Sequence, residues 1–285
     1  MGTGTLYIVA TPLGNLEDIT LRAIRVMKEV AVVACEDTRR TVKLLNRYEI
    51  HTPLTVFHEY NKLRAAPGIL RRLRDGDSVA LVSDAGTPAI SDPGYELVRA
   101  AIAAGIRIEV VPGPSALIAS LVLSGLPTDR FVFEGFLPGR GEKRRKALEA
   151  LAGETRTMIF YESPQRVAAF LAEAARVFGA RRACVVRELT KVHEEILRGT
   201  LPELSAEIAG RASVLGEITV VIGGASKTVD LPVDDVVRRA LESATGSSRD
   251  LAREIAGRTG LSRKDVYAEI LRQRERGTPL DGEPE

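Results

Sequence analysis

Short strands that are apolar on both faces alternate with helical segments along most of the chain, and this alternation most constrains the fold. The runs TLYIVA (5–10), VAVVAC (30–35) and SVALV (78–82) have the length of strands and are mostly apolar. Between them, apolar residues recur at helical spacing. Strands that are buried on both faces are typical of a parallel sheet covered by helices. The sequence therefore predicts an α/β fold.

The pattern predicts two α/β domains followed by a small helical module. Residues 1–126 read as a parallel-sheet domain. In residues 127–224 the segment 194–199 is short and polar, as in an edge strand or hairpin arm, so we expect a mixed sheet there. Residues 225–285 contain two short amphipathic helices joined by a turn at 258–262, which is the spacing of a helix-turn-helix pair. The tail 277–285 is rich in Gly, Pro and acids and is expected to fray.

Composition excludes several classes of protein. Lys and Arg number 40 and Asp and Glu 38, so any nucleic-acid site must be a local basic patch. The two cysteines, Cys35 and Cys184, lie far apart within apolar runs, which predicts reduced core residues and neither a disulfide nor a metal site. There is no secretory signal pattern and no apolar run near 20 residues. We therefore expect a cytoplasmic protein that binds no membrane and no metal.

Four polar loops directly follow predicted strands of the first domain, and they predict one ligand site. They are residues 11–15, 36–39, 83–88 and 111–115. In open α/β sheets the carboxyl ends of the strands line the ligand crevice, so these loops should meet at one edge. A Gly-x-Gly-x-x-Gly motif after the first strand and a P-loop motif are both absent, which disfavours a nicotinamide enzyme and a P-loop ATPase.

Seven motifs in order along the chain carry a family resemblance. They are ATPLGN (10–15), CEDTRR (35–40), SDAGTPAISDPG (83–94), VPGPSA (111–116), FEGFLP (133–138), FYESPQR (160–166) and RELTKVHEE (187–195). Together they resemble the ribosomal RNA small subunit methyltransferase I family of the tetrapyrrole methylase superfamily, over residues 5–224 and again in the terminal helix pair. The segment HEYNK (58–62) departs from the family pattern, in which a second His and an acid are expected.

The resemblance implies an activity, a cofactor and partners. It implies S-adenosylmethionine-dependent 2′-O-methylation of a cytidine in 16S ribosomal RNA, with the cofactor in a cleft between the two α/β domains. The substrate would be 16S rRNA or the small ribosomal subunit, and the protein would be a homodimer. Within the motifs, the residues expected to bind the cofactor are Pro12, Leu13, Gly14, Asp84, Gly86, Thr87, Pro114, Ser115, Ala116 and Tyr161.

A ribose hydroxyl is a poor nucleophile, so a general base should assist its attack. The candidates are Glu36, Asp37, His58 and Glu188, with the acids favoured over the histidine. His51 and His193 are the other two histidines, and His193 reads as a surface residue beside two acids. For Asp37 the competing interpretation is a helix N-cap.

Basic residues near the predicted cleft are candidates for RNA contacts. The segment GRGEKRRK (139–146) carries five basic residues and one acid at the start of a helix, where positive charge opposes the helix dipole. Phosphate contacts would offset that cost. The residues expected to bind substrate are Arg39, Arg140, Lys143, Arg144, Arg145, Arg187 and Lys191.

Two other functions stay open at the level of sequence. One is a small-molecule methyltransferase that acts on a tetrapyrrole in the same type of cleft. The other is a ligand-sensing regulator whose terminal module binds DNA. The basic loop and the terminal helix pair favour the RNA enzyme, because a macrocyclic substrate requires neither.

Overall fold

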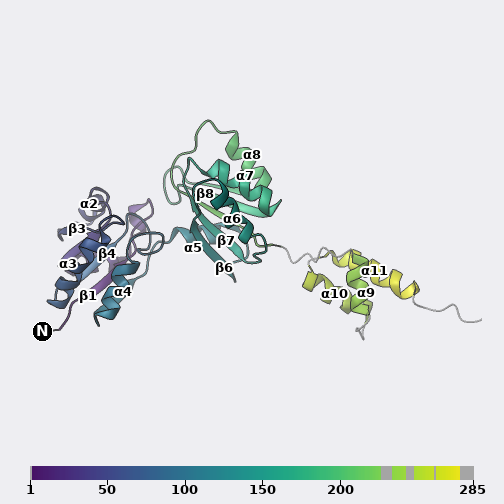
Figure 1. Ribbon diagram of the computed structural model, residues 1–285, viewed down its shortest axis with the longest axis horizontal. Helices are drawn as coiled ribbons and strands as arrows, with labels where there is room; N and C mark the ends of the chain where they lie inside the picture. Colours follow the sequence, from purple (N-terminus) through teal and green to yellow (C-terminus); the bar gives the residue numbers. More distant parts are fainter. Residues whose placement is uncertain (1, 226–232, 242–246, 260, 277–285) are drawn as a thin grey trace, which may run out of the picture. The chain divides into compact units, whose positions relative to one another are not determined.

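The computed structural model describes residues 2–225, 233–241, 247–259 and 261–276 (Figure 1). Within it the chain divides into two compact units, residues 1–223 and 224–285. Both sheets belong to the first unit, so its boundary does not test the expected division between residues 126 and 127. The three-domain division stays a prediction, which limited proteolysis of the whole chain can test.

The first sheet has five strands, all parallel, in the spatial order β3-β2-β4-β1-β5. The strands are β1 (Thr5–Val9), β2 (Val32–Cys35), β3 (Leu54–Val56), β4 (Val79–Val82) and β5 (Arg107–Val111). The central strands β2 and β4 are buried along their whole length, which explains why their sequences are apolar without alternation. The predicted parallel sheet is confirmed.

Helices follow the strands as the alternation predicts. They are the 3₁₀ helix η1 (Leu16–Asp18) and the α-helices α1 (Leu21–Glu29), α2 (Thr38–Arg47), α3 (Lys62–Arg74) and α4 (Tyr95–Ala103). Thr20 is the N-cap of α1, where its side chain accepts from the Ala23 N–H at 3.1 Å. Helix α3 begins at Lys62 and contains Pro67. Ile69 and Leu73 are buried on α3, and this packing outweighs the backbone hydrogen bond that proline removes.

The second sheet is mixed, in the order β6-β7-β10-β8-β9. Its strands are β6 (Phe131–Phe136), β7 (Thr157–Glu162), β8 (Arg182–Arg187), β9 (Glu195–Thr200) and β10 (Ile218–Ile222). Strand β10 runs antiparallel to both β7 and β8. Its first residue, Ile218, is therefore opposite Glu162 and Arg187 at the carboxyl ends of those two strands. The predicted mixed sheet and the predicted edge strand near 194–199 are both confirmed.

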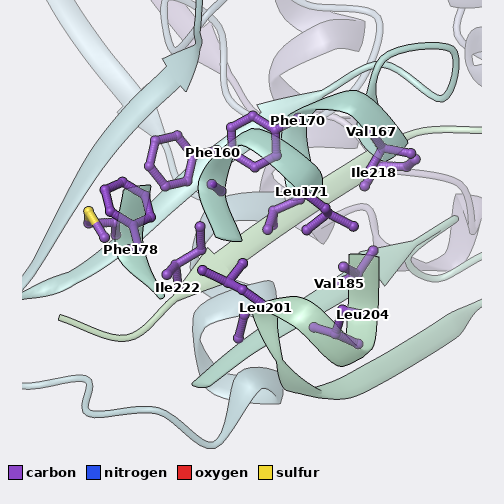
Figure 2. Packing of buried hydrophobic residues seen from close by; sticks show 14 of the residues in the cluster. Phe160, Val167, Phe170, Leu171, Phe178, Val185, Leu201, Leu204, Ile218 and Ile222 are labelled. Carbon is purple, nitrogen blue, oxygen red and sulfur yellow. The ribbon is translucent and has the colours of Figure 1, made fainter. Parts of the chain in front are cut away.

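The second sheet is covered on one face by α7 (Val167–Phe178) and α8 (Leu201–Ala209), together with α6 (Glu142–Ala150). Figure 2 shows this core, in which Phe160 of β7 lies against Phe170 of α7 with ring centroids 5.3 Å apart. The opposite face packs against α5 (Ala116–Ser124), through Leu121 and Leu117. Helix α5, which we expected in the first domain, thus completes the core of the second sheet.

Cys35 and Cys184 are free and buried, as predicted. Each sits in an apolar strand, and burial raises the pKa of both thiols. Among the described residues, no helix is both long and apolar enough to cross a membrane.

The described residues of the second unit form the helices α9 (Val233–Leu241), α10 (Ser248–Thr259) and α11 (Arg263–Arg276) (Figure 1). Its core contains Val237, Leu251, Ile255, Val266 and Ile270. The two predicted helices are present, but sequence reasoning missed α9, which supplies Val237. Leu271 of α11 is 40% exposed. The tail 277–285 and Gly260 of the predicted turn lie outside the described residues.

Candidate functional site

Hydrogen bonds join the four loops that follow the strands of the first sheet. Thr11 and Gly86 exchange two backbone bonds, at 2.8 and 2.9 Å, which link the loops after β1 and β4. The Asp37 N–H donates to Asp84 Oδ1 at 3.0 Å, and Thr87 Oγ1 donates to the Pro114 carbonyl at 3.3 Å. The loop 83–88 is therefore bonded to the loops after β1, β2 and β5. The prediction that these loops gather at one edge is confirmed.

The backbone of residues 83–94 takes unusual conformations beside this edge. Gly86 has φ +83° and Gly94 has φ +150°, which glycine adopts at little cost. Ala89 and Ser91 also have positive φ, at +68° and +61°, where a side chain is strained. A β-carbon on Gly94 would lie 3.0 Å from Leu81 and 3.1 Å from Ala89, so there is little space for a side chain.

A pocket of about 390 Å³ lies between this edge and the second sheet. Loop residues of the first sheet line one side of it, and the ends of β6, β7 and β8 with the start of β10 line the other. Phe136 and Tyr161 form an aromatic part of the wall, with ring centroids 5.6 Å apart. The volume falls in the range of small-ligand sites.

The lining of the pocket is acidic. It contains one guanidinium, from Arg40, and five carboxylates, from Glu36, Asp84, Asp92, Glu162 and Glu217. Such a lining favours a ligand with positive charge, because close opposite charges in a partly desolvated site attract strongly.

Three of these carboxylates have cationic partners. Asp84 Oδ2 lies 3.5 Å from Arg40 Nε. Glu162 pairs with Arg166 at 2.9 Å, and Glu217 pairs with Lys191 at 3.2 Å. These partners fix the three side chains and partly neutralise them.

Glu36 and Asp92 differ from the other three acids, since neither forms an ion pair with any residue that the structure describes. Burial raises the pKa of Asp92 to about 7, with further contributions from the negative charges of Glu36 and Asp84 that exceed the opposing hydrogen bond to Ser83. Burial and then the charge of Asp84 also raise the pKa of Glu36. The site thus holds a carboxyl group that titrates near neutral pH.

Most residues predicted to bind the cofactor lie in this pocket. The lining includes Leu13, Asp84, Gly86, Thr87, Ser115, Ala116 and Tyr161. Pro12 instead lines a smaller hollow beside Thr41 and Ser83. Pro114 contributes its carbonyl as the acceptor for Thr87. Gly14 faces Lys191, and a β-carbon on it would come within 2.2 Å of Lys191 Cγ.

The four residues predicted as catalytic do not all line the pocket. Only Glu36 lines the pocket. Asp37 is the N-cap of α2, as the competing interpretation had it, and its bonds with Arg39 hold its pKa at about 2. The Nδ1 of His58 accepts from the Asn61 N–H at 3.2 Å, within the turn that begins α3. Glu188 lies with Lys191 in the wall of a neighbouring open hollow.

Glu188 and Lys191 form a connected group with Glu217. Lys191 Nζ donates to Glu188 Oε1 at 2.7 Å and to Glu217 Oε2 at 3.2 Å. Burial alone would raise the pKa of Glu188, but the bonds from Lys191 and the Glu217 N–H hold it below its usual value. Because Glu217 lines the pocket while Glu188 and Lys191 line the neighbouring hollow, this group connects the two linings.

One residue of the basic cluster at the start of α6, Arg144, does not lie where the sequence predicts it. Arg144 is 2% exposed, and its guanidinium forms two bonds with Glu173, at 2.7 and 2.8 Å. Its third bond, at 3.0 Å, goes to the Gly139 carbonyl. The expectation that Arg144 contacts RNA is therefore wrong, since the side chain is buried and neutralised on the α7 side of α6.

The other basic residues expected to bind substrate are near the surface. Arg140, Lys143 and Arg145 are exposed, and Arg145 pairs with Glu149 at 2.9 Å. Arg39 is exposed and paired with Asp37. Arg187 pairs with Glu195 at 2.9 Å.

Several lining residues were not singled out from the sequence. They are Arg40, Ile90, Ser91, Asp92, Phe136, Glu162, Ser163, Pro164, Val186, Leu189 and residues 216–219. Residues 216–219 could not be predicted from the rule that sites lie at the carboxyl ends of strands, because they lie at the amino end of β10. In the part of the chain that the structure describes, no group of three or more His, Cys, Asp or Glu side chains could hold a metal ion.

Comparison with known proteins identifies relatives of the chain. The family described as Tetrapyrrole (Corrin/Porphyrin) Methylases matches residues 5–205. A protein of Halalkalibacterium halodurans named ribosomal RNA small subunit methyltransferase I is 44% identical over 274 residues, covering 93% of each chain. Proteins of the same name from Xylella fastidiosa and Mesorhizobium japonicum are 52% and 45% identical. They match 78% and 97% of this chain, and 82% and 95% of their own lengths.

Solved structures share the fold at low identity. A cobalt precorrin-4 methyltransferase aligns with TM-score 0.60 and 19% identity, over 77% of this chain and 94% of its own. A uroporphyrin-III C-methyltransferase from Thermus thermophilus, complexed with S-adenosylhomocysteine, aligns with TM-score 0.55 and 24% identity, over 77% of this chain and 97% of its own. The two-sheet body is thus the tetrapyrrole methylase fold. On the identity and coverage of its relatives, the chain belongs to the ribosomal RNA small subunit methyltransferase I family of tetrapyrrole methylases.

Proposed function

We propose that this protein transfers the methyl group of S-adenosylmethionine to the 2′-hydroxyl of a cytidine in 16S ribosomal RNA. The observation that carries the proposal is the acidic pocket between the two sheets. S-adenosylmethionine has a positive sulfonium and a positive amine. The five carboxylates of the pocket lining can attract both groups. Its adenine can pack against apolar and aromatic lining residues such as Leu13, Phe136 and Tyr161.

The loop 83–94 is proposed as the centre of the cofactor site. Two contacts position the Asp84 carboxylate. The Asp37 N–H donates to one of its oxygens, and Arg40 pairs with the other. Gly86 has φ +83°, and a β-carbon on it would lie 3.3 Å from Leu13, so glycine lets this loop pack closely against Leu13 in the pocket wall. Thr87, Ser115 and Ala116 complete this side of the pocket.

Asp92 is proposed as the group that receives the proton of the 2′-hydroxyl. When bound, S-adenosylmethionine supplies an electrophilic methyl group. The Asp92 carboxylate would take the hydroxyl proton as the ribose oxygen bonds to the methyl carbon and the sulfur keeps the electron pair of the broken C–S bond. A base with pKa about 7 is well matched to proton transfer near neutral pH.

Glu36 is proposed to hold the pKa of Asp92 high. Both acids line the pocket, and the negative charge of Glu36 is the largest charge contribution to the raised pKa of Asp92. The two groups therefore titrate as a coupled pair. Of the residues that sequence reasoning favoured as bases, Glu36 keeps this supporting role, whereas Asp37 is engaged as a helix cap.

Replacing Asp84 by Ala is expected to weaken S-adenosylmethionine binding by about 10- to 100-fold, because a charged acceptor is lost and its partners are left unpaired. Isothermal calorimetry on the folded variant measures the effect. Glu149→Ala is the matched control, since Glu149 is an exposed acid that pairs with Arg145 and does not line the pocket. Unchanged affinity in Asp84→Ala would refute this placement of the cofactor.

RNA binding is proposed to involve the exposed residues Arg140, Lys143 and Arg145, with Lys191 and Arg187 nearer the pocket. Phosphate contacts of this kind are independent of sequence and position the strand, while base contacts specify it. A tetrapyrrole substrate is less favoured, because relatives at 44–52% identity carry the rRNA name. The solved tetrapyrrole enzymes are below 25% identity.

A homodimer is proposed from the family resemblance. It is supported by exposed apolar side chains on the first unit, including Val110 at 55% and Val122 at 67% exposure. Light scattering at micromolar concentration tests it, with a monomeric mass as the contrary result. A cytoplasmic location is part of the same proposal, because the substrate is ribosomal.

A further inference from the structure

The helical unit formed by α9, α10 and α11 carries a hollow of its own, of about 370 Å³. Its lining consists of Arg249 from the first turn of α10, Arg263 and Lys264 from the first turn of α11, and Tyr267 one turn further along. The hollow is therefore open on a surface that contributes three positive charges and one aromatic ring. It belongs to a different unit from the pocket described above.

The three cations of the hollow have no acidic partner among the residues that the structure describes. Arg249, Arg263 and Lys264 are exposed, and no described residue forms an ion pair with any of them. By contrast, Arg272 on the same helix α11 pairs with Glu269 at 2.7 Å. The unpaired cations thus gather on one surface, while a paired one lies elsewhere on the helix.

This arrangement does not serve the stability of the helices. Like charges close together repel, and this repulsion costs free energy in the absence of an anion. The first turns of α10 and α11 also carry Asp250 and Asp265, which favour the helix dipole. A polyanion that enters the hollow would remove the repulsion among the cations.

Tyr267 adds a second kind of contact. It packs against the core of the unit and also lines the hollow, so its ring is anchored on one side and accessible on the other. Aromatic side chains of this type stack on unpaired bases, and cations around them hold the adjoining phosphates. Protein partners with acidic surfaces would satisfy the cations but would not need the ring.

We propose that the hollow formed by Arg249, Arg263, Lys264 and Tyr267 binds a single-stranded segment of RNA, with phosphates on the three cations and a base stacked on Tyr267. This proposal rests on the proposed function in one respect, because the RNA substrate is the expected source of the single strand. The hollow is an anchoring site on the substrate and takes no part in methyl transfer.

The test uses the full chain and protein-free 16S rRNA, with filter binding measured across a range of salt concentrations. The Arg263→Ala/Lys264→Ala variant is expected to lower the salt-dependence slope by about 1.4, since each lost single-strand phosphate contact removes about 0.7. Tyr267→Leu, which keeps an apolar side chain against the core, is expected to bind about 5- to 100-fold more weakly with the slope unchanged. Tyr267→Phe should bind like the parent protein.

Arg253→Ala is the matched control, because Arg253 is an exposed cation on α10 outside the hollow. Calorimetry with S-adenosylmethionine should give parental affinity in every variant. The proposal is overturned if Arg263→Ala/Lys264→Ala loses no more affinity than Arg253→Ala. It is also overturned if affinity falls for intact small subunits alone, which would identify a ribosomal protein as the partner. Because RNA binding is measured directly, the result stands even if the parent protein methylates another substrate.

Discussion

The Asp92→Asn variant is expected to transfer methyl groups about 10²- to 10⁴-fold more slowly than the parent protein at saturating substrates. The amide has nearly the shape of the carboxyl group but does not accept a proton from the ribose hydroxyl. Asp92 has no cationic partner among the described residues, so its replacement breaks no ion pair. Single-turnover methylation of 16S rRNA measures the rate.

The pH dependence of the same rate separates a base from a structural residue. Because the carboxylate form is active and burial raises the pKa of Asp92 to about 7, the parental rate should rise with pH and level off above that value. Glu36→Gln removes a charge that raises this pKa, so its profile should shift to lower pH. Asp92→Asn should lose the ascending limb. A parental rate in Asp92→Asn, or an unshifted profile in Glu36→Gln, would contradict the assigned roles.

The Asp92→Asn substitution should slow methyl transfer but raise the thermal stability of the protein above neutral pH. A carboxyl group whose pKa is raised on folding contributes stability below its unfolded pKa, and that contribution is lost as pH rises through about 7. Asp92→Asn is therefore expected to melt at a higher temperature than the parent protein at pH 8, but at no higher temperature at pH 4. Such an exchange of activity for stability is typical of functional sites.

Arg144→Ala is expected to destabilise the first unit by about 3 kcal/mol, a large effect for one substitution. The guanidinium is buried and makes two bonds to Glu173, so truncation leaves a partly buried carboxylate without its partner. The low end of the range for buried pairs applies, because the Glu173 side chain is 26% exposed. In a unit of this size the melting temperature should fall by about 6–12 °C.

The neighbouring residue provides the control. Arg145 is exposed and pairs with Glu149 along the helix, so Arg145→Ala should cost no more than about 0.5 kcal/mol. The order of the two effects should reverse in the RNA-binding assay. There Arg145→Ala should weaken binding, whereas folded Arg144→Ala should bind RNA like the parent protein. Equal melting temperatures for both variants would show that the Arg144–Glu173 pair contributes little.

The architecture could be predicted from the sequence because it depends on local patterns. Strands such as β2 and β4 are buried on both faces, and their apolar runs are therefore continuous. The site edge could be predicted as well, because in a parallel sheet the loops after β1, β2, β4 and β5 must meet. Helix α9 was missed, since its apolar face is short and polar stretches surround it.

The details of the site depend on tertiary packing that local patterns do not encode. The start of β10 lines the pocket only because that strand runs antiparallel to its neighbours. Asp92 acquires its raised pKa from burial and from Glu36, which is 56 residues away in the chain. Arg144 is in a run of basic residues that looks uniformly exposed, but Glu173 on α7 draws it inward.

The most direct test of the proposed activity is to locate the methyl group on the RNA. Purified protein, S-adenosylmethionine carrying a labelled methyl group and small ribosomal subunits are incubated, and the 16S rRNA is digested for mass spectrometry. The expected result is label in 2′-O-methylcytidine at one position, with none in reactions that contain Asp92→Asn. Label on a base, label spread over many ribose positions, or label absent from rRNA while a tetrapyrrole is methylated would contradict the proposal.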